Sequence, residues 1–264
     1  MKDDKRLSIW KTKLQRLDLD SGTIVEVEDE VANDEAICLF VNDYYYTTFI
    51  VSPTMIRELV IGHLLSEGIV EKLSEIETVE FKPSRVSAYL NHELDSRKLR
   101  DKRPSVISTF CGNSGKTVRL EEFQKLETND VKVEPELIWS LITELNKKSE
   151  IYKRTGGTHS AMLYDMKGVN FFAEDVGRHN AVDKAIGAAF LAGADMEKSI
   201  LVCSGRMSGD MVLKAFRSRI PIIASVAGSL ESGIRIAQNL GVSLIGFVRG
   251  RRMNIYTHGE RIAS

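Results

Sequence analysis

The segment Ser108–Lys116, with the sequence STFCGNSGK, places a cysteine among residues that are typical of an exposed turn. Cysteine is usually buried in a core, where its thiol acts as a small apolar group. Cys111 is instead followed by GNSGK, and glycine, asparagine and serine favour turns. Lys116 and nearby backbone N–H groups would favour the reactive thiolate form. The segment therefore predicts a mobile loop with a nucleophilic thiol at Cys111; an exposed thiol without chemistry is the alternative.

The two other cysteines lie in apolar runs. Cys38 is part of AICLFV and Cys203 is part of SILVCSG, so we expect both to be buried thiols. Three widely spaced cysteines without a CxxC pair indicate neither a disulfide framework nor a zinc site.

Two further segments have the composition of an anion site at a helix start. They are Asp175–Asn180 (DVGRHN) and Ser204–Ser208 (SGRMS), and each follows an apolar run that predicts a strand. The free N–H groups of a helix start attract anions. Arg178 and Arg206 can each bind a phosphate with two hydrogen bonds. The alternative is that Asp175, Asn180 and Ser204 only cap helices and that the arginines are solvated.

Two more segments could complete such a site. Thr155–Ser160 (TGGTHS) is a small-residue loop that carries Thr158 and His159, although a single histidine is more often structural. Phe247–Arg252 (FVRGRR) places three arginines around a glycine at the end of a strand, where they could hold a large anion. A basic turn at a sheet edge is the alternative there. Lys184 and Lys214 could be ordinary surface charges on their helices.

The second half of the chain predicts alternating helices and strands. We expect helices at about 135–148, 178–192, 208–218 and 231–240, and strands at 160–164, 169–173, 199–203, 221–225, 243–248 and 253–257, the last at an edge. The later strands are short continuous apolar runs, as expected when helices cover both faces of a sheet. In such a sheet, ligands bind at the carboxyl ends of the strands.

The first half is predicted to be rich in strands. We expect a strand at Thr23–Glu28, a hairpin of Glu35–Val41 and Tyr44–Val51 turning at Asn42-Asp43, and a strand at Val86–Leu90. A helix should begin at Ser52-Pro53, with Ser52 as its N-cap, and end at Gly68. The predicted domains are 1–125, β-rich α+β, and 126–264, with the boundary between Glu122 and Glu134.

The element order of the second domain resembles the cytidine-deaminase-like three-layer α/β/α sandwich, which makes the whole an α/β protein. Deaminases of that fold carry H-x-E and P-C-x-x-C at two helix starts for zinc. The matching positions here read DVGRHN and SGRMS, so we expect no zinc and no deamination. The alternative is a degenerate zinc hydrolase, and metal analysis that finds stoichiometric zinc would favour it over our expectation.

Composition narrows the class of protein. The chain has 264 residues, of which 43% are hydrophobic and 28% charged, with a net charge of −1, so it is globular without the basic excess of a nucleic-acid binder. The start MKDDKRLSIWKTKLQRLD has no apolar signal region, and no apolar run reaches membrane-spanning length. We therefore expect a cytoplasmic protein that neither binds nucleic acid nor enters a membrane.

Taken together, these segments resemble the FdhD family of formate dehydrogenase accessory sulfurtransferases. The segments that carry the resemblance span nearly the whole chain: SPTMIRELVIGHLLSEGIV (52–70), CGNSGK (111–116), RTGGTHSAML (154–163), EDVGRHNAVDKAIG (174–187), SGRMSGDMVLKA (204–215) and GFVRGRRMNIYT (246–257). EDVGRHNAVDK is the most specific of them.

The resemblance implies a sulfurtransferase that takes persulfide sulfur from a cysteine desulfurase of the IscS type. The sulfur would pass to the bis-molybdopterin guanine dinucleotide form of the molybdenum cofactor for the catalytic subunit of formate dehydrogenase. Cys111 would carry the sulfur. The cofactor, or a GDP-like nucleotide in its place, would contact Phe247, Val248, Arg249, Gly250, Arg251, Arg252, Arg178, His179, Arg206, Ser208, Thr158 and His159. A homodimer is also expected.

One position departs from the family pattern. Many members read CGxCG in the loop, whereas this chain has Ser114 at the second cysteine position. A persulfide needs a single thiol, so sulfur transfer remains possible, but resolution of the persulfide as an internal disulfide does not. A non-catalytic chaperone for guanine nucleotide or molybdopterin is therefore the alternative function.

Overall fold

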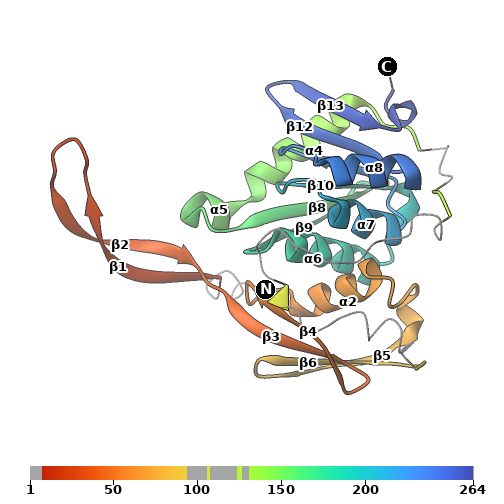
Figure 1. Cartoon of the computed structure of the whole chain (residues 1–264), viewed down its shortest axis with the longest axis horizontal. Coiled ribbons are helices and arrows are strands. Elements are labelled where there is room, and N and C mark those ends of the chain that lie inside the picture. Colours follow the sequence, from red (N-terminus) through yellow and green to blue (C-terminus); the bar gives the residue numbers. More distant parts are fainter. Residues whose placement is uncertain (1–7, 94–105, 108–123, 127–130, 264) are drawn as a thin grey trace.

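The computed structural model describes residues 8–93, 106–107, 124–126 and 131–263. Two β-sheets lie on either side of a layer of helices, and a third sheet, a two-stranded ribbon, extends away from the body (Figure 1). The fold is thus mixed α/β. No helix among the described residues is long and apolar enough to cross a membrane.

The two-stranded ribbon consists of β1 (Ile9–Leu17) and β2 (Ile24–Ala32). The strands pair antiparallel from Ile9 opposite Ala32 to Leu17 opposite Ile24. The predicted strand at Thr23–Glu28 lies at the same place as β2, which extends further toward the body. β1 was not expected, because the apolar residues of IWKTKLQRL, at positions 9, 10, 14 and 17, do not alternate with polar ones as they do in a typical half-buried strand.

The predicted hairpin is confirmed. β3 (Glu35–Val41) and β4 (Tyr44–Val51) pair antiparallel, and Asn42 and Asp43 have φ of 47° and 66°. Such left-handed pairs form the tight turn that matches strand twist. The sheet has the order β5-β6-β3-β4-β7, with β5 (Ile76–Lys82), β6 (Arg85–Leu90) and β7 (Val106–Ile107).

The second sheet has the order β13-β12-β11-β10-β8-β9. Its strands are β8 (His159–Asp165), β9 (Val169–Asp175), β10 (Ser199–Cys203), β11 (Ile222–Ser225), β12 (Ser243–Arg249) and β13 (Arg252–Thr257). The helices are α4 (Pro135–Lys148), α5 (Glu150–Thr155), α6 (Arg178–Leu191), α7 (Gly209–Arg217) and α8 (Glu231–Leu240). Apart from α5, these elements were predicted with bounds within two residues, and β13 is the expected edge strand.

Helices cover both faces of this sheet, as predicted. Ile138 and Leu141 of α4 pack with Ile200 and Val202 on one face. On the other face, Leu201 and its neighbours pack against α6 and α7 in the larger core. The closer likeness to cytidine deaminases and the division into two domains stay predictions.

The helix that was predicted to begin at Ser52 begins four residues later, as α2 (Ile56–Ser66). Ser52 is not its N-cap, because its polar groups are used elsewhere. Its N–H donates to Asp175 Oδ2 at 3.1 Å, and its Oγ accepts from the Val176 N–H at 3.1 Å. Met55, with φ of 54°, is the residue that precedes the helix. The N-terminal part of the chain is thus bonded to the end of β9.

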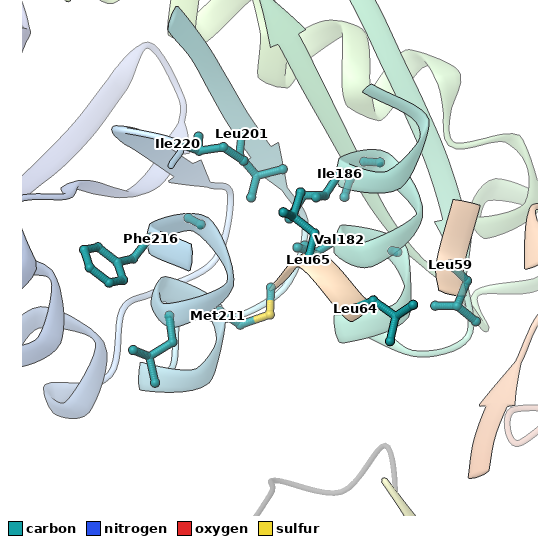
Figure 2. Packing of buried hydrophobic residues seen from close by; sticks show 14 of the residues in the cluster. Leu59, Leu64, Leu65, Val182, Ile186, Leu201, Met211, Phe216 and Ile220 are labelled. Carbon is teal, nitrogen blue, oxygen red and sulfur yellow. The ribbon is translucent and has the colours of Figure 1, made fainter. Parts of the chain in front are cut away.

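Helices α2 and α6 lie side by side between the two sheets (Figure 1). They approach at Gly62 and Gly187, where a Cβ atom on Gly62 would overlap the carbonyl oxygen of Asp183 and one on Gly187 would overlap that of Glu58. Only glycine permits this backbone contact. Figure 2 shows the apolar side chains around it, including Leu59 and Leu65 of α2 and Val182 and Ile186 of α6.

A buried ion pair lies at one side of this helix contact. Lys184 Nζ lies 2.6 Å from Asp175 Oδ2 and donates to the Ser52 carbonyl at 2.9 Å. Asp175 also accepts hydrogen bonds from the Gly177 N–H and from Asn180 Nδ2. Both ions are fully buried. The suggestion that Lys184 is a surface charge is therefore wrong, because its ammonium neutralises a carboxylate inside the protein.

A second buried cluster joins α2, α6 and α7, and it shows that Lys214 is not a surface charge either. Lys214 Nζ donates to both Asp183 oxygens at 2.9 Å and to Ser66 Oγ at 3.0 Å, and His63 Nδ1 lies 3.0 Å from Asp183 Oδ2. Burial opposes ionisation of Asp183, but Lys214 and His63 outweigh it and hold the pKa of Asp183 well below its usual range. The cluster is an ionic link between three helices, in which the other ring nitrogen of His63, Nε2, is buried and has no hydrogen-bond partner among the described residues.

Substitution of Gly187 by alanine should destabilise the fold. Alanine in a helix normally stabilises by about 1 kcal/mol relative to glycine. Here we expect the opposite sign and a loss of at least about 2 kcal/mol, since the methyl group would force α2 and α6 apart. Chemical denaturation measures the free energy of unfolding. Ser140→Ala, on the solvent-exposed side of α4, is the control. A stabilised Gly187→Ala variant would contradict the contact.

Substitution of Lys184 by methionine should cost about 3–5 kcal/mol of unfolding free energy, because the Asp175 carboxylate would stay buried without its counter-ion. The double variant Asp175→Asn/Lys184→Met should recover a large part of that loss. A double-mutant cycle by denaturation tests this, and strictly additive losses would show that the two side chains do not interact.

Candidate functional site

The predicted site segments meet at one edge of the second sheet. Strands β10, β11 and β12 are parallel, so their carboxyl ends share this edge. Because β8 and β13 are antiparallel to their neighbours, their first residues, His159 and Arg252, lie at the same edge. The last residue of β9, Asp175, pairs with His159 and lies there too. This edge, which we call the ligand edge, also receives the starts of α6, α7 and α8.

Arg178 and the SGRMS segment are in contact at the ligand edge. A Cβ atom on Gly205 would lie 2.9 Å from Arg178 Cβ and 3.0 Å from its Cδ, so the arginine stem lies on the glycine backbone. Glycine at 205 is needed for this approach. Arg178 Nε is buried and has no hydrogen-bond partner among the described residues. Arg206 follows Gly205 directly and is exposed.

Two histidines flank Arg178, and burial keeps both neutral. His159 Nδ1 lies 3.2 Å from Ser204 Oγ, which also accepts from the Ser160 N–H. Burial first, and then the charge of Arg178, lowers the pKa of His159. Burial, Lys214 and Arg178 lower the pKa of His179 to about 4. At neutral pH both imidazoles can therefore donate a hydrogen bond to an anion without adding charge.

The starts of α6, α7 and α8 have no side-chain cap. The alternative that Asn180 and Ser204 cap helices is thus not what the structure shows: Asn180 Nδ2 donates to the Ile50 carbonyl and to Asp175, and Ser204 binds His159 and Ser160. The hydroxyls of Ser208 and Ser229 are buried and have no partner among the described residues. Met207 and Ser229 form a parallel bridge that holds these two starts together.

Phe247 extends the ligand edge to β12 in a strained conformation. Its φ is 52°, a value that is rare for an aromatic residue. A Cβ atom on Gly228 would lie 2.8 Å from Phe247 Cζ, so the ring rests on the glycine of the loop before α8. The guanidinium of Arg249 lies over the Phe247 ring, with its Cζ 5.0 Å from the ring centroid. The irregular pairing of β12 with β13 between Gly246 and Arg249 accommodates this backbone.

The remaining residues of Phe247–Arg252 differ in where they point. Val248 is buried in the core on the α4 side. Gly250 and Arg251, with φ of 58° and 60°, form the tight turn between β12 and β13. Arg251 donates two hydrogen bonds to Glu136 of α4, at 2.7 and 2.8 Å, and its guanidinium lies over the Trp139 ring. Arg251 is thus engaged with α4, whereas Arg249 and Arg252 are exposed at the edge.

Thr158 lies beside the ligand edge, but its hydroxyl binds the same carboxylate as the start of α5 does. Its Oγ1 donates to Glu174 Oε1 at 3.1 Å, and the same carboxylate accepts from the N–H groups of Ile151 and Tyr152. Thr158 and Glu174 therefore fix the loop that carries His159.

The cysteines divide into three environments. Burial raises the pKa of Cys203 to about 11, so this thiol stays protonated and unreactive at neutral pH. Cys203 is buried as predicted, whereas Cys38 is only half-buried, with its Sγ 3.4 Å from Thr48 Oγ1. Cys111 and its CGNSGK loop lie outside the described residues. Within the described ranges, no group of three His, Cys, Asp or Glu side chains could hold a metal ion.

The arrangement suits a ligand with several negative groups. Three helix starts without a side-chain cap lie along one edge, together with Arg178 Nε and the hydroxyls of Ser208 and Ser229, which have no partner in the part of the chain that the structure describes; all of them are donors for phosphate. Sequence reasoning missed Gly228 and Ser229. The small-residue segment AGSLESG at 227–233 could have indicated them, because it repeats the strand–glycine–helix pattern of the two recognised starts.

Comparison with known proteins agrees with this description. The FdhD/NarQ family matches residues 32–263. A protein of Wolinella succinogenes named sulfur carrier protein FdhD is 35% identical over 258 residues, which cover 96% of this chain and 89% of that protein. A protein of the same name from Methanothermobacter thermautotrophicus is 36% identical over 236 residues, covering 89% of this chain and 92% of the relative.

A solved structure is similar as well. A crystal structure described as a formate dehydrogenase accessory protein of Desulfotalea psychrophila has a TM-score of 0.79 and 28% identity, and the match covers 97% of this chain and 99% of that one. Since the family match spans most of the sequence and the relatives are similar over nearly their full lengths, this chain belongs to the FdhD/NarQ family.

Proposed function

We propose that this protein is a sulfur carrier in the maturation of formate dehydrogenase. It would accept persulfide sulfur from a cysteine desulfurase and transfer it to the bis-molybdopterin guanine dinucleotide form of the molybdenum cofactor. Family membership and the names of the relatives support the carrier role. Thiol chemistry of this kind suits the reducing cytoplasm.

The observation that carries the proposal is the set of unpaired phosphate donors at the ligand edge. A buried N–H or hydroxyl without a partner is costly, so such groups indicate a ligand that completes them. The guanine dinucleotide of the cofactor has diphosphates that would accept from Arg178, Ser208, Ser229 and the helix starts. In this role the cofactor is substrate rather than a resident group, and Arg206, Arg249 and Arg252 add positive charge around it.

The sulfur step assigns the thiol chemistry to Cys111. Its thiolate attacks the outer sulfur of the donor persulfide, a new S–S bond forms on Cys111, and the donor cysteine leaves as thiolate. Release of that sulfur as sulfide needs two electrons, which a thiol from outside this loop would supply, because Ser114 cannot close a disulfide. Cys203 is unsuited to this step, since its thiol is buried and protonated.

Replacement of Cys111 by alanine should abolish sulfur loading. With a cysteine desulfurase and radiolabelled cysteine, we expect about one labelled sulfur per wild-type chain and an added mass of about 32 Da on Cys111, the persulfide state of a thiol. Cys111→Ala should fall to background, and Cys38→Ala should load normally as the control. Equal labelling of wild type and Cys111→Ala would refute the carrier function and leave the non-catalytic chaperone.

Replacement of Arg206 or Arg252 by alanine should weaken the binding of GDP, a probe for the guanine dinucleotide. We expect each substitution to raise the Kd for GDP about tenfold, which is the order of a charge-assisted hydrogen bond at a partly solvated site. Calorimetry measures it, with Arg219→Ala as the control, because Arg219 follows α7 at the opposite edge and pairs with Glu197. Arg251→Ala should have a smaller effect, since Glu136 and Trp139 hold that guanidinium. Unchanged affinity in both Arg206→Ala and Arg252→Ala would remove the assigned site.

A further inference from the structure

The β1–β2 ribbon meets the body of the protein at its base, where the end of β2 lies beside α5 (Figure 1). Arg154 of α5 donates two hydrogen bonds of 2.6 Å to Glu30 of β2, from Nε and Nη2 to the two carboxylate oxygens. Most surface ion pairs contribute little, but the bidentate pair of an arginine and a carboxylate is the geometry that can hold two elements in place. The Glu30–Arg154 pair therefore fixes α5 relative to the ribbon.

A close steric contact lies beside this ion pair. A Cβ atom on Gly157 would lie 2.8 Å from the Cβ of Ala32, so the Gly157 backbone rests on the alanine methyl group. A residue with a side chain would not fit there. The turn before it is compact, because Gly156 has a φ of 67° and the Gly157 N–H donates to Thr155 Oγ1 at 3.1 Å. The ribbon base thus contacts the segment that begins at Arg154 at two points.

This segment leads to the ligand edge. His159 follows Gly157 by two residues and begins β8, with its Nδ1 3.2 Å from Ser204 Oγ. Arg154 and His159 are five positions apart, a distance of about 17 Å even in a fully extended chain. Between them, Thr158 binds the Glu174 carboxylate that also binds the start of α5, so the helix and the loop form one unit. The outer end of that unit is attached to the ribbon.

The ribbon base reaches the ligand edge by a second route as well. Strand β2 is followed after two residues by β3, which pairs with β4 so that Glu35 lies opposite Val51. The next residue, Ser52, donates its N–H to Asp175 at 3.1 Å, and Asp175 is the register partner of His159. Both residues at this end of the ligand edge are therefore connected to the base of the ribbon.

We propose that Glu30 and Arg154 are positioning residues for the ligand edge, because their ion pair holds the segment 154–159 so that His159 lies beside Arg178. The inference rests on the proposed function, in which this edge binds the phosphates of a guanine nucleotide. Glu30 occupies the guanidinium of Arg154, so the pair acts on the ligand through His159 and not by contact. Its loss should weaken binding by displacing the loop.

The same face of the ribbon provides a matched control. Glu28 lies two residues from Glu30 along β2, so both side chains point to one face. Glu28 pairs with Lys11 at 3.2 Å within the ribbon, whereas Glu30 joins the ribbon to the body. The side chain of Glu28 is 60% exposed and that of Glu30 is 28% exposed. Neutralising either one changes the net charge equally, so a difference between the two variants reports the contact with α5.

Calorimetry of the full chain with GDP as the probe tests the positioning role. Glu30→Gln and Arg154→Met should each raise the Kd for GDP about fivefold, the size of effect that residues acting through their neighbours have on a site. The double variant should bind no more weakly than either single variant, because both substitutions remove the same contact. Glu28→Gln should bind GDP as the wild type does.

The protonation of His159 is a second readout, and it needs no ligand. Burial first, and then the charge of Arg178, lowers the pKa of His159, while Asp175 opposes this change. When the loop is released in Glu30→Gln, water reaches the imidazole and its pKa should rise toward the ordinary value. NMR titration of the imidazole C–H signals measures the midpoint, with His159→Gln to assign the signal. Glu28→Gln should leave the midpoint unchanged.

Thermal unfolding shows whether each variant is folded, and Arg154→Met replaces Glu30→Gln if that variant is not. The inference is overturned if Glu30→Gln leaves the titration of His159 unchanged, or if Glu28→Gln shifts it as far. It is also overturned if Glu30→Gln binds GDP as tightly as the wild type or more tightly, since tighter binding would show that the released Arg154 contacts the ligand itself. If the wild type binds no GDP, the proposed function loses its ligand, and the titration of His159 alone decides the positioning role.

Discussion

The contact between α2 and α6 is the constraint on which the rest of the structure depends. Two helices from distant parts of the chain touch through their backbones at Gly62 and Gly187, and no side chain separates them. This contact joins the N-terminal sheet to the second sheet through one continuous core. Buried polar contacts help to fix how the helices lie along each other, because Asp183 of α6 binds His63 and Ser66 of α2, and Lys184 of α6 donates to the Ser52 carbonyl ahead of α2. The start of α6, and with it Arg178, is thereby placed at the ligand edge.

The segment 174–184, EDVGRHNAVDK, shows how such a constraint shapes a sequence. Most of its polar residues face the interior: Glu174 holds the start of α5, Asp175 binds Lys184, and Asp183 binds Lys214. Arg178 and His179 are the ones that take part in the ligand edge. A motif that looks like a binding site in the sequence thus consists largely of buried structural contacts, and these contacts determine where Arg178 and His179 point. Loss of these contacts would therefore weaken ligand binding by displacing the two site residues, although the buried residues themselves do not touch the ligand.

The strands of the second sheet could be predicted closely from the sequence, whereas the buried polar contacts of the protein could not. Apolar runs such as SILVC and IIAS predicted β10 and β11 closely, since a strand covered on both faces has few alternatives. Lys184 and Lys214 were not predictable, because lysine is rarely buried and their partners lie on other elements or a turn away. The start of α2 was misplaced for the same reason: Ser52-Pro53 has the local pattern of a helix start, but a carboxylate 123 residues away uses the Ser52 N–H. Local patterns report periodicity and turns, whereas long-range polar partners are decided by packing.

The electrostatics of the ligand edge fit a protein that must release what it binds. Burial and the nearby cations lower the pKa of His179 to about 4 and also lower that of His159, so that near neutral pH both are uncharged beside the Arg178 cation. A bound anion favours the protonated imidazoles and raises their pKa values, and proton uptake then strengthens the binding as the pH falls. In the neutral range an anion bound there would be held by hydrogen bonds from helix starts, hydroxyls and arginines, without two further positive charges. For the proposed carrier, two neutral imidazoles would keep the binding weaker than two charged ones would, and this would help the cofactor pass on to the next protein.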